Sequence, residues 1–328
     1  MADYKGIQGF TIQNLSADPS NPIEGQVWYN STSNVWKVEE ATTVGSWATG
    51  GNMGTARYGL EGAGTQTEAL AFGGYLPGAT NATEEYNGTS WSGGGSLPVA
   101  KYEPGGTGTQ TAGLCFGGNP YAPSGAVNTT EEYDGSAWTA GGNMATVKRA
   151  PAGAGTQTAG LAAGSDAPPS GSTEEYNGST WTTGGTMGTA RGGSGGAGIQ
   201  TAALAFGGYT GIDVTGATEE YDGSTWTAGG TMSLARTTFA GFGIQTLAIA
   251  AGGYTGGSPT KTNATEAYDG TSWTTSPATI ATTRDIIGAA GTNPAGVIFG
   301  GRVSGTGSAA TEEWTGAGAP LTQTITVS

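Results

Sequence analysis

One nine-residue pattern recurs through this sequence and limits what the chain can fold into. It reads TEEYDGSTW at Thr218–Trp226. Close copies begin at Thr83, Thr130, Thr173 and Thr265, and a weaker copy, TEEWTGAGA, begins at Thr311. The aromatic residue at its fourth position recurs at spacings of 47, 43, 45, 47 and 46 residues. A period in the forties with about one Trp per copy is typical of propellers and solenoid arrays.

Within each copy, the sequence predicts four short strands. The first follows a basic residue and is rich in small residues, as in ARGGSGGAG from Ala190, and the second follows a TQT-like turn, as in TAALAFGG from Thr201. The third contains the Glu pair and the fourth begins at the Trp, and the Asn-Gly or Asp-Gly between them is a strong hairpin signal. Radial stacking of such antiparallel sheets buries both faces of each sheet, with Gly and Ala nearest the axis. We expect almost no helix.

The repeat resembles the kelch repeat, whose pattern is a basic residue, a Gly pair that ends a hydrophobic strand, a Tyr, and a Trp soon after it. In the first copy these are Arg57, Gly73–Gly74, Tyr86 and Trp91. Other copies match at Lys101/Gly117–Gly118/Tyr133/Trp138, Arg191/Gly207–Gly208/Tyr221/Trp226 and Arg236/Gly252–Gly253/Tyr268/Trp273. The resemblance covers roughly residues 44–328. It implies an all-β fold, a six-bladed kelch-type β-propeller, and it says little about activity.

Two copies depart from the pattern, and the identity of the strand that would close such a ring stays open. The third copy has Ala163–Gly164 for the Gly pair, and the last copy has Trp314 at the Tyr position. Trp47 begins an extra fourth strand that could complete the last blade, and the C-terminal segment LTQTITV competes for that place. A seventh, irregular blade built with VWYNSTSNVWKV is the alternative. The expected domains are an N-terminal arm over 1–43 and a propeller over 44–328.

The arm contains the segment Glu24–Val38, EGQVWYNSTSNVWKV, which reads as two alternating strands around a polar turn. It is similar to a short hairpin motif found near the attachment ends of tailed-phage fibre and virion proteins. This resemblance implies a virion protein that is attached to other virion proteins through Trp28, Tyr29 and Trp36. A lone hairpin is marginally stable, so we expect the arm to pack on another protein or on the propeller rim.

Charge and composition exclude several classes of partner. The net charge is −14 and the pI about 4.2, which disfavours binding to nucleic-acid phosphates. No stretch approaches the roughly 20 apolar residues of a membrane span, and the N-terminus lacks the apolar core of a signal peptide. The single cysteine, Cys115, lies in the apolar run GLCFGG, and we expect it to be a small buried side chain. We expect neither nucleic-acid binding nor membrane insertion.

The residues that carry most enzymatic chemistry are missing or evenly repeated. There is no His, which removes His-dependent triads and His-ligated metals, including the copper site of galactose oxidase, a kelch-type enzyme. The Glu pairs recur in nearly every copy, whereas an active site is usually singular, so we expect one Glu to pair with the basic residue of its repeat and the other to face solvent. Each Asp-Gly turn offers calcium only one carboxylate. We therefore expect no enzyme, cofactor or metal. The basic residues that we expect to pair with one Glu of each repeat are Arg57, Lys101, Arg149, Arg191, Arg236 and Arg284.

The best candidate for a binding surface is a set of loops. In a four-stranded meander, the second-to-third and fourth-to-first connections lie on the same face, and the second-to-third connections differ most among the copies. Binding residues often lie on variable loops held by a rigid scaffold. The candidate ligand-binding residues are Tyr75, Tyr121, Tyr209, Asp213, Tyr254, Lys261 and Arg302. The alternative is that these loops merely tolerate change.

These observations favour a non-enzymatic phage virion protein that belongs to a homo-oligomer or larger assembly. As a tail-fibre or receptor-binding module, it would present its loops to a host surface glycan or protein. As a capsid decoration protein, it would grip the shell through the arm. A cellular kelch module that binds another protein is a third reading, but no accompanying interaction domain is recognisable in the sequence. We favour the tail role, because the hairpin motif resembles fibre proteins.

Overall fold

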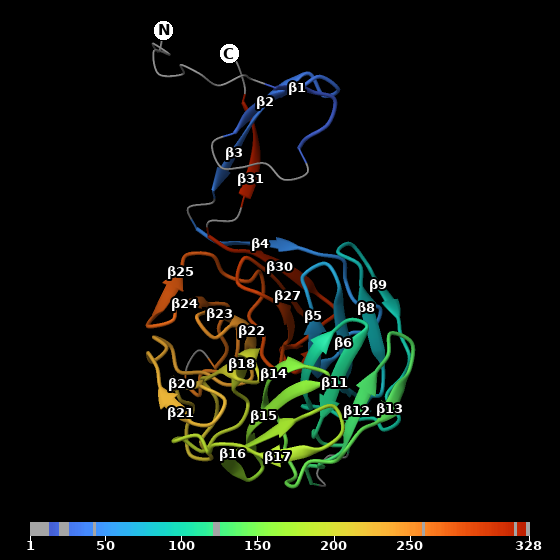
Figure 1. The fold of residues 1–328 in the computed structure, drawn as a ribbon, viewed down its shortest axis with the longest axis vertical. Helices are drawn as coiled ribbons and strands as arrows, with labels where there is room; N and C mark the ends of the chain where they lie inside the picture. The colour runs from blue at the N-terminus through green and yellow to red at the C-terminus, as the bar shows by residue number, and fades with distance from the viewer. Residues whose placement is uncertain are drawn as a thin grey trace. The chain divides into compact units, whose positions relative to one another are not determined.

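The computed structural model describes residues 13–19, 26–41, 44–120, 125–257, 260–317 and 320–325. Every helix or strand assigned within them is a β-strand (Figure 1), so the expected all-β class is confirmed. The strands form two units. One spans Ser46–Thr315, and the other combines the two ends of the chain, Met1–Gly45 and Gly316–Ser328.

In the larger unit, the described repeats form six antiparallel sheets, which we call repeat sheets 1 to 6. Sheet 1 has β5 (Tyr58–Gly64), β6 (Ala69–Leu76), β8 (Thr83–Tyr86) and β9 (Trp91–Gly93), with β7 (Gly78–Ala79) beside β6. Sheet 2 has β10 (Gly105–Thr109), β11 (Ala112–Phe116), β12 (Thr130–Tyr133) and β13 (Trp138–Ala140). Sheet 3 has β14 (Ala152–Thr156), β15 (Ala159–Asp166), β16 (Pro169–Tyr176) and β17 (Trp181–Thr183).

The remaining repeat sheets follow the same order. Sheet 4 has β18 (Gly195–Ile199), β19 (Ala202–Phe206), β20 (Thr218–Tyr221) and β21 (Trp226–Ala228). Sheet 5 has β22 (Ala240–Ile244), β23 (Leu247–Ala251), β24 (Thr265–Tyr268) and β25 (Trp273–Ser276). Sheet 6 has β26 (Gly288–Gly291), β27 (Ala295–Phe299), β30 (Thr311–Thr315) and, as its fourth strand, β4 (Ser46–Thr49); β28 (Arg302–Val303) and β29 (Thr306–Gly307) form a small hairpin between β27 and β30. The Trp47 segment therefore takes the last place in sheet 6, as one of the two readings expected.

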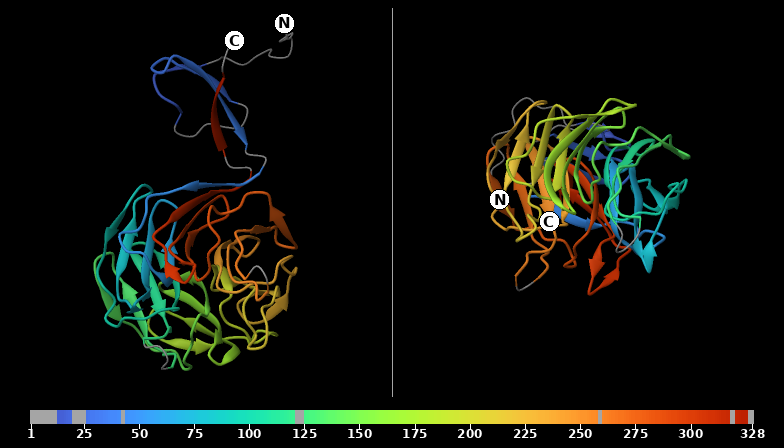
Figure 2. Two further views of the ribbon diagram at one scale, coloured as in Figure 1. Left: turned by 180° about the vertical axis from the view of Figure 1, so that it is seen from behind. Right: turned by 90° about the horizontal axis from the view of Figure 1, so that it is seen from below.

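The innermost strands explain the high glycine content. Each first strand contacts the first strand of the next sheet, in the order β5, β10, β14, β18, β22, β26 and back to β5. Figures 1 and 2 show the repeat sheets arranged around a common centre. A Cβ at Gly153 would lie 2.2 Å from the Gly106 carbonyl oxygen, and one at Gly196 would lie 2.3 Å from that of Gly153. Larger side chains would force these strands apart. Four-stranded antiparallel sheets in this arrangement are consistent with a β-propeller.

The Asp-Gly turn of the repeat sets the register of the outer strands. In sheet 4, Tyr221 pairs with Trp226 across the hairpin. The Asp222 carboxylate accepts hydrogen bonds from the backbone N–H groups of Ser224, at 2.8 Å, and Thr225, at 2.7 Å. Gly223 has φ +92°, a conformation that glycine adopts without strain. These short-range interactions make the Tyr and the Trp neighbours on one side of each sheet.

Three polar contacts recur between neighbouring sheets and accompany the apolar packing. The Trp138 indole N–H donates to Thr83 Oγ1 at 3.0 Å, and the Tyr133 hydroxyl donates to Glu85 Oε1 at 2.5 Å. The Gln157 amide donates to the carbonyl oxygens of Gly113, at 3.1 Å, and Tyr133, at 2.6 Å. We call these the Trp–Thr, Tyr–Glu and Gln contacts.

The junction between sheets 5 and 6 departs from this pattern. Ala267 stands where other copies have the second Glu, and Trp314 stands where they have Tyr, so the Tyr–Glu contact cannot form. Asn293 stands at the Gln position, and in the described part of the chain it accepts a hydrogen bond from Trp314 Nε1 at 3.4 Å instead. The Trp–Thr contact remains, since Trp47 Nε1 donates to Thr265 Oγ1 at 2.9 Å. We call this junction the seam.

The smaller unit contains one four-stranded sheet in its described residues, with strand order β1 (Gln13–Leu15), β2 (Val27–Asn30), β3 (Val35–Ala41) and β31 (Pro320–Ile325). The expected hairpin is β2–β3, paired from Val27↔Val38 to Asn30↔Val35. Its outer strands are supplied by the same chain, β1 in parallel and β31 in antiparallel register. The LTQTITV segment thus pairs with β3 instead of sheet 6, and the hairpin does not form part of a seventh repeat sheet. The expected propeller range of 44–328 includes this C-terminal segment, whereas the structure pairs Pro320–Ile325 with β3.

Candidate functional site

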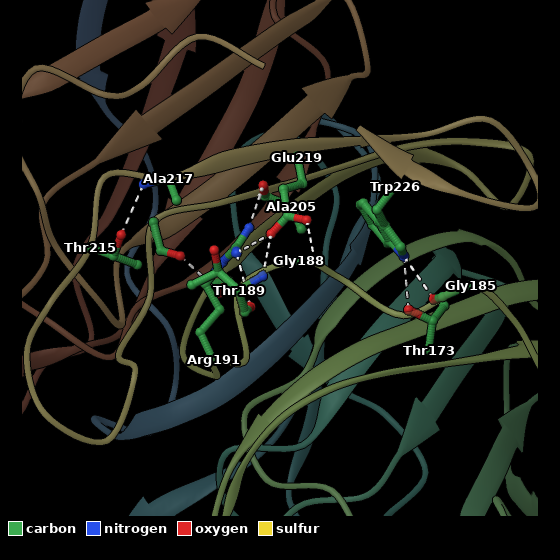
Figure 3. Close-up of polar contacts among 12 residues, drawn as sticks. Thr173, Gly185, Gly188, Thr189, Arg191, Ala205, Thr215, Ala217, Glu219 and Trp226 are labelled. Carbon is green, nitrogen blue, oxygen red and sulfur yellow. Dashed lines mark hydrogen bonds and ion pairs between the residues drawn. The ribbon is translucent and has the colours of Figure 1, made fainter. Parts of the chain in front are cut away.

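The first Glu of the repeat is held by a buried ion pair, as expected. Arg191 has a fully buried side chain, and its guanidinium lies 2.5 Å from Glu219 Oε1. Glu219 also accepts hydrogen bonds from the backbone N–H groups of Gly188, at 2.6 Å, and Thr189, at 3.2 Å (Figure 3). Equivalent pairs are Arg57–Glu84, Lys101–Glu131, Arg236–Glu266 and Arg284–Glu312. These carboxylates therefore hold the lead-in segments, by which we mean the buried basic residue of each copy and the three residues that follow it.

In the third copy, the basic residue is Lys148, and the expectation of Arg149 was wrong. Lys148 is fully buried, and its ammonium group donates to Ser172 O at 2.9 Å and Ser172 Oγ at 2.7 Å. Burial lowers the pKa of Lys148 to about 8, although Glu174 partly offsets the effect. The spacing could have identified it: Lys148 lies 16 residues before Gly164, as Arg57 lies 16 residues before Gly73.

The second Glu of the repeat does not face solvent, contrary to expectation. It is partly buried and accepts the hydroxyl hydrogen bond of a Tyr in the next repeat sheet. In sheet 4, the Tyr221 hydroxyl donates to Glu175 Oε1 at 2.5 Å, and burial together with this bond raises the pKa of Tyr221 to about 12. The same contact joins Tyr86 to Glu313, Tyr133 to Glu85, Tyr176 to Glu132 and Tyr268 to Glu220. Both Glu residues of the repeat therefore have structural partners.

The second-to-third connections meet the lead-in segments, as the meander geometry predicted. The backbone N–H of Lys101 donates to Thr80 O at 3.2 Å, and that of Arg191 donates to Ser170 O at 3.2 Å. Single bridges join Gly192 to Tyr209 and Thr237 to Tyr254 in the same way. These segments form one surface of the larger unit, which we call the loop face. The opposite surface carries the first-to-second and third-to-fourth turns, and we call it the turn face.

Two of the candidate binding residues come together at Asp285, which is fully buried. Its carboxylate accepts two hydrogen bonds from Arg302, at 3.1 and 2.7 Å, and lies 2.9 Å from the Lys261 ammonium group. Lys261 also donates to the Arg302 carbonyl oxygen at 2.8 Å. The Arg302 guanidinium lies 5.7 Å from the centre of the Tyr58 ring. Lys261 and Arg302 are therefore fixed by each other and by Asp285, and their side chains remain 20% and 35% exposed.

Tyr75 belongs to an aromatic cluster beside this group. Its ring centre lies 5.2 Å from that of Tyr58 and 5.6 Å from that of Tyr102. Tyr75 also lines a surface hollow of about 480 Å³ together with the exposed Val99 and with Pro120. A flat ring beside a hollow of this size suits an apolar or sugar face.

Of the other candidate residues, Tyr254 pairs with Lys261 and so lies beside the Asp285 group, whereas no hydrogen bond or ion pair among the described residues joins Tyr209 or Asp213 to it. Tyr209 is 37% exposed. Asp213 is exposed and its carboxylate accepts the backbone N–H of Val214 at 2.8 Å. Tyr254 is half-buried, and its backbone pairs with the lead-in residue Thr237 and with Lys261. Tyr121 lies outside the described residues.

Residues of the lead-in segments were missed as candidates. One residue from each segment has a positive φ, and each donates its N–H to the carbonyl oxygen of the residue before it in a closed cycle, over distances of 2.5–3.1 Å. The six are Gly59, Glu103, Ala150, Gly193, Thr238 and Ile286. Glu103 is one of four non-glycine residues among them, and a left-handed conformation costs such residues roughly 1–2 kcal/mol. We call this cycle the loop-face ring.

Glu103 is the lead-in residue with the most unusual chemistry. Burial and the nearby Asp166 raise the pKa of Glu103 to about 7, although Arg149, at 3.3 Å, partly offsets this. Arg149 is itself bound to Asp166 at 2.8 Å. The lead-in positions after the buried basic residue differ between copies as much as the loops do, and this variation is the signal that could have identified them.

The residues expected to attach the chain lie in the smaller unit. Trp28 is fully buried, and its indole N–H donates to Asp18 Oδ1 at 3.1 Å. Tyr29 and Trp36 are half-buried, with ring centres 5.3 Å apart. Within this unit, Trp28 supports the sheet, while Tyr29 and Trp36 keep some exposed surface.

The described residues contain no group of three or more His, Cys, Asp or Glu side chains placed to hold a metal ion. No helix long and apolar enough to cross a membrane occurs in the part of the chain that the structure describes. Cys115 is fully buried, as expected. No protein-family model matches the chain, and no curated protein is significantly similar to it.

Proposed function

We propose that residues 46–315 form a closed, six-bladed propeller of the kelch type. Three observations support this proposal: six repeat sheets, first strands that contact one another in cyclic order, and the closed cycle of backbone hydrogen bonds in the loop-face ring. Strand β4 from the start of the array completes sheet 6 at its end. The start and the end of the repeat array are therefore joined by backbone hydrogen bonds within one sheet.

We propose further that the chain is a structural protein of a tailed-phage particle, either a tail fibre component or a tail-associated adhesin. The smaller unit would attach it to other virion proteins, and the propeller would bind the host surface. The hairpin motif of β2–β3 supports the phage assignment. Strands β1 and β31 both pair in the sheet that holds this motif, so a single small unit is available for attachment.

The observation that carries a binding role is the contrast between the two faces of the larger unit. The turn face repeats nearly the same residues, whereas the loop face combines varied connections with exposed or half-buried Tyr75, Tyr209 and Tyr254. Tyr rings give flat contact area at low entropic cost. Asp285 offsets one of the two positive charges of Lys261 and Arg302, and the chain as a whole has a net charge of −14, so a neutral glycan or a polar protein surface suits the face better than a strongly anionic ligand.

We propose also that the chain has no catalytic role, and the Glu contacts support this. All five complete Glu pairs are engaged in contacts within the fold, where each carboxylate binds a basic side chain, a backbone N–H or a Tyr hydroxyl. A glycosidase needs two carboxylates that flank a substrate bond.

Binding of the purified full-length chain to a glycan array and to cells of the host tests the proposal. Tyr209→Ala and Tyr75→Ala should each weaken binding by about tenfold, since one stacked ring contributes about 1–1.5 kcal/mol. Leu247→Ala, which alters an exposed residue at a turn-face position, is the matched control and should bind as the wild type does. Equal losses in all three variants, or binding that only the turn-face variant loses, would contradict the proposal.

A further inference from the structure

A polar channel runs along the centre of the larger unit. Its volume is about 190 Å³, and residues of the innermost strands of all six repeat sheets line it. Each first strand pairs along one edge with the second strand of its sheet, so alternate backbone N–H and C=O groups on its other edge face the channel. Most lining residues are Gly or Ala. The channel can therefore offer hydrogen-bond acceptors along its length, and it has room for several water molecules or a narrow ligand.

Glu61 is the one ionisable residue among the described residues that line this channel. The other five copies have a small residue at the position of Glu61. Identified by their pairing with the second strand, these residues are Gly105, Ala152, Gly195, Ala240 and Gly288. A Cβ on Gly106 of the next first strand would lie 2.7 Å from Glu61 Cγ, so that glycine leaves room for the Glu61 side chain. One copy of the repeat thus places a carboxyl group where the other five keep the channel neutral.

The Glu61 carboxyl group has no cationic partner within the described residues. Its one hydrogen bond there comes from the backbone N–H of Gly62, at 3.0 Å to Oε1. Burial raises the pKa of Glu61 to about 8. Two other titratable groups lie close to Glu61: Glu103, which lines a second, smaller hollow together with Glu61, and the buried Cys115. Neither supplies a positive charge. Glu61 is half-buried, and a carboxylate that is partly removed from water without a cationic partner favours the uptake of a proton or a cation.

We propose that the channel binds a primary ammonium group, on an unbranched chain, against the Glu61 carboxylate. One carboxylate balances one positive charge, and the three N–H donors of an ammonium group match the carboxylate and the backbone acceptors of the channel. A divalent metal ion fits less well, because the described residues offer no group of three ligating side chains, and such ions take several oxygen ligands. The source of the ammonium group is either a free amine or a lysine side chain of a partner protein. The net charge of −14 favours either cation near the surface.

Calorimetric titration of the full chain with n-butylammonium chloride tests this proposal. At pH 7 the ammonium group should displace the proton of Glu61, so one proton is released per molecule bound. The affinity should rise by about tenfold between pH 7 and pH 9, because the carboxyl group is mostly protonated at the first pH and mostly ionised at the second. Glu61→Gln should bind at least tenfold more weakly at pH 9 and lose the pH dependence. Glu68→Gln, which alters an exposed Glu in the adjacent turn, is the matched control and should behave as the wild type does.

Other titrations separate the competing explanations. Tetramethylammonium, which has no N–H donor, should bind at least tenfold more weakly than n-butylammonium. Tight binding of K⁺ or Ca²⁺ at the same ionic strength, without binding of n-butylammonium, would overturn the ammonium assignment. The absence of proton release by the wild type would overturn it as well, and that result does not depend on whether the Glu61→Gln variant folds. If n-butylammonium binds, titration with a lysine-containing peptide distinguishes a partner side chain from a free amine.

Discussion

At the scale of single residues, the repeated pattern supplies contacts in which one carboxylate satisfies several donors. Glu219 binds the buried Arg191 and two backbone N–H groups, and Arg191 also donates to the Ala205 carbonyl oxygen at 3.2 Å (Figure 3). Buried ion pairs add little net stability relative to apolar residues, but removing one partner leaves an uncompensated charge. The five copies that contain this ion pair therefore depend on both partners being present.

Glu219→Ala should lower the free energy of unfolding by about 3–5 kcal/mol, because Arg191 would remain buried without its counter-charge. Denaturant unfolding of the full chain measures this change. Glu68→Ala, at an exposed position, is the control and should change stability by less than about 0.5 kcal/mol. A loss below about 1 kcal/mol for Glu219→Ala would show that the buried pair does not hold the lead-in segment.

The residue-scale roles could be predicted only where the pattern was regular. The pairing of the first Glu with the basic residue follows from their repetition along the sequence, and the structure shows it in five of the six copies. The role of the second Glu was missed, because its partner is a Tyr in a neighbouring sheet and sequence spacing does not show which sheets are neighbours. Arg149 and Lys148 are adjacent basic residues, and only the spacing to Gly164 distinguishes them.

At the scale of elements, the seam is the junction that lacks two of the three recurring polar contacts. The Trp–Thr contact is retained there, while the Tyr–Glu contact is replaced by Ala267 and Trp314. Trp314 packs instead against Trp47, with ring centres 5.1 Å apart, so apolar contact substitutes for a polar one. Asn293 is one methylene shorter than the Gln of the other copies, and the Gln contact is the one that a single substitution can restore.

Asn293→Gln should raise the free energy of unfolding by about 0.5–1.5 kcal/mol, since one net hydrogen bond contributes about that amount. Gln157→Asn, which makes the reverse change at a complete junction, should lower it by a similar amount. Thermal or denaturant unfolding of both variants measures the pair. If the two substitutions shift stability in the same direction, the assignment of the seam to these contacts is wrong.

The strand order within each sheet could be predicted because turns and strands repeat with the same chemistry. The partner of the last strand could not. SWAT and LTQTITV both carry alternating polar and apolar residues, and nothing in their sequence states which edge each one joins. The structure pairs β4 with β30 and β31 with β3. Long-range strand pairing depends on which edges remain free once the rest of the chain has folded.

At the scale of the whole molecule, the five Tyr hydroxyls that bond to a Glu of a neighbouring sheet have pKa values raised by the same causes. Burial and the bond to a neighbouring Glu raise the pKa of each to about 12, from about 10 in the unfolded chain. Between these values the folded chain keeps protons that the unfolded chain loses. Stability from these groups is therefore fully present below pH 10 and is lost as the pH rises from about 10 to 12.

The free energy of unfolding should accordingly fall steeply above pH 10.5. Lys148 acts in the opposite sense, because its folded pKa of about 8 lies below its unfolded value of about 10.5, but it is one group against five and its effect levels off above pH 10.5. Urea unfolding at pH 9, 10.5 and 11.5 measures the slope. The double variant Tyr221→Phe, Tyr268→Phe should be less stable at pH 9 and show a shallower slope, and an unchanged slope would contradict the assignment.

The number of copies per particle tests the proposed function most directly. Quantitative mass spectrometry of purified particles gives this number relative to the major capsid protein. A tail-associated adhesin with closed symmetry should be present in a small multiple of three or six copies. A count on the order of hundreds would contradict the tail assignment and place the chain on the capsid shell.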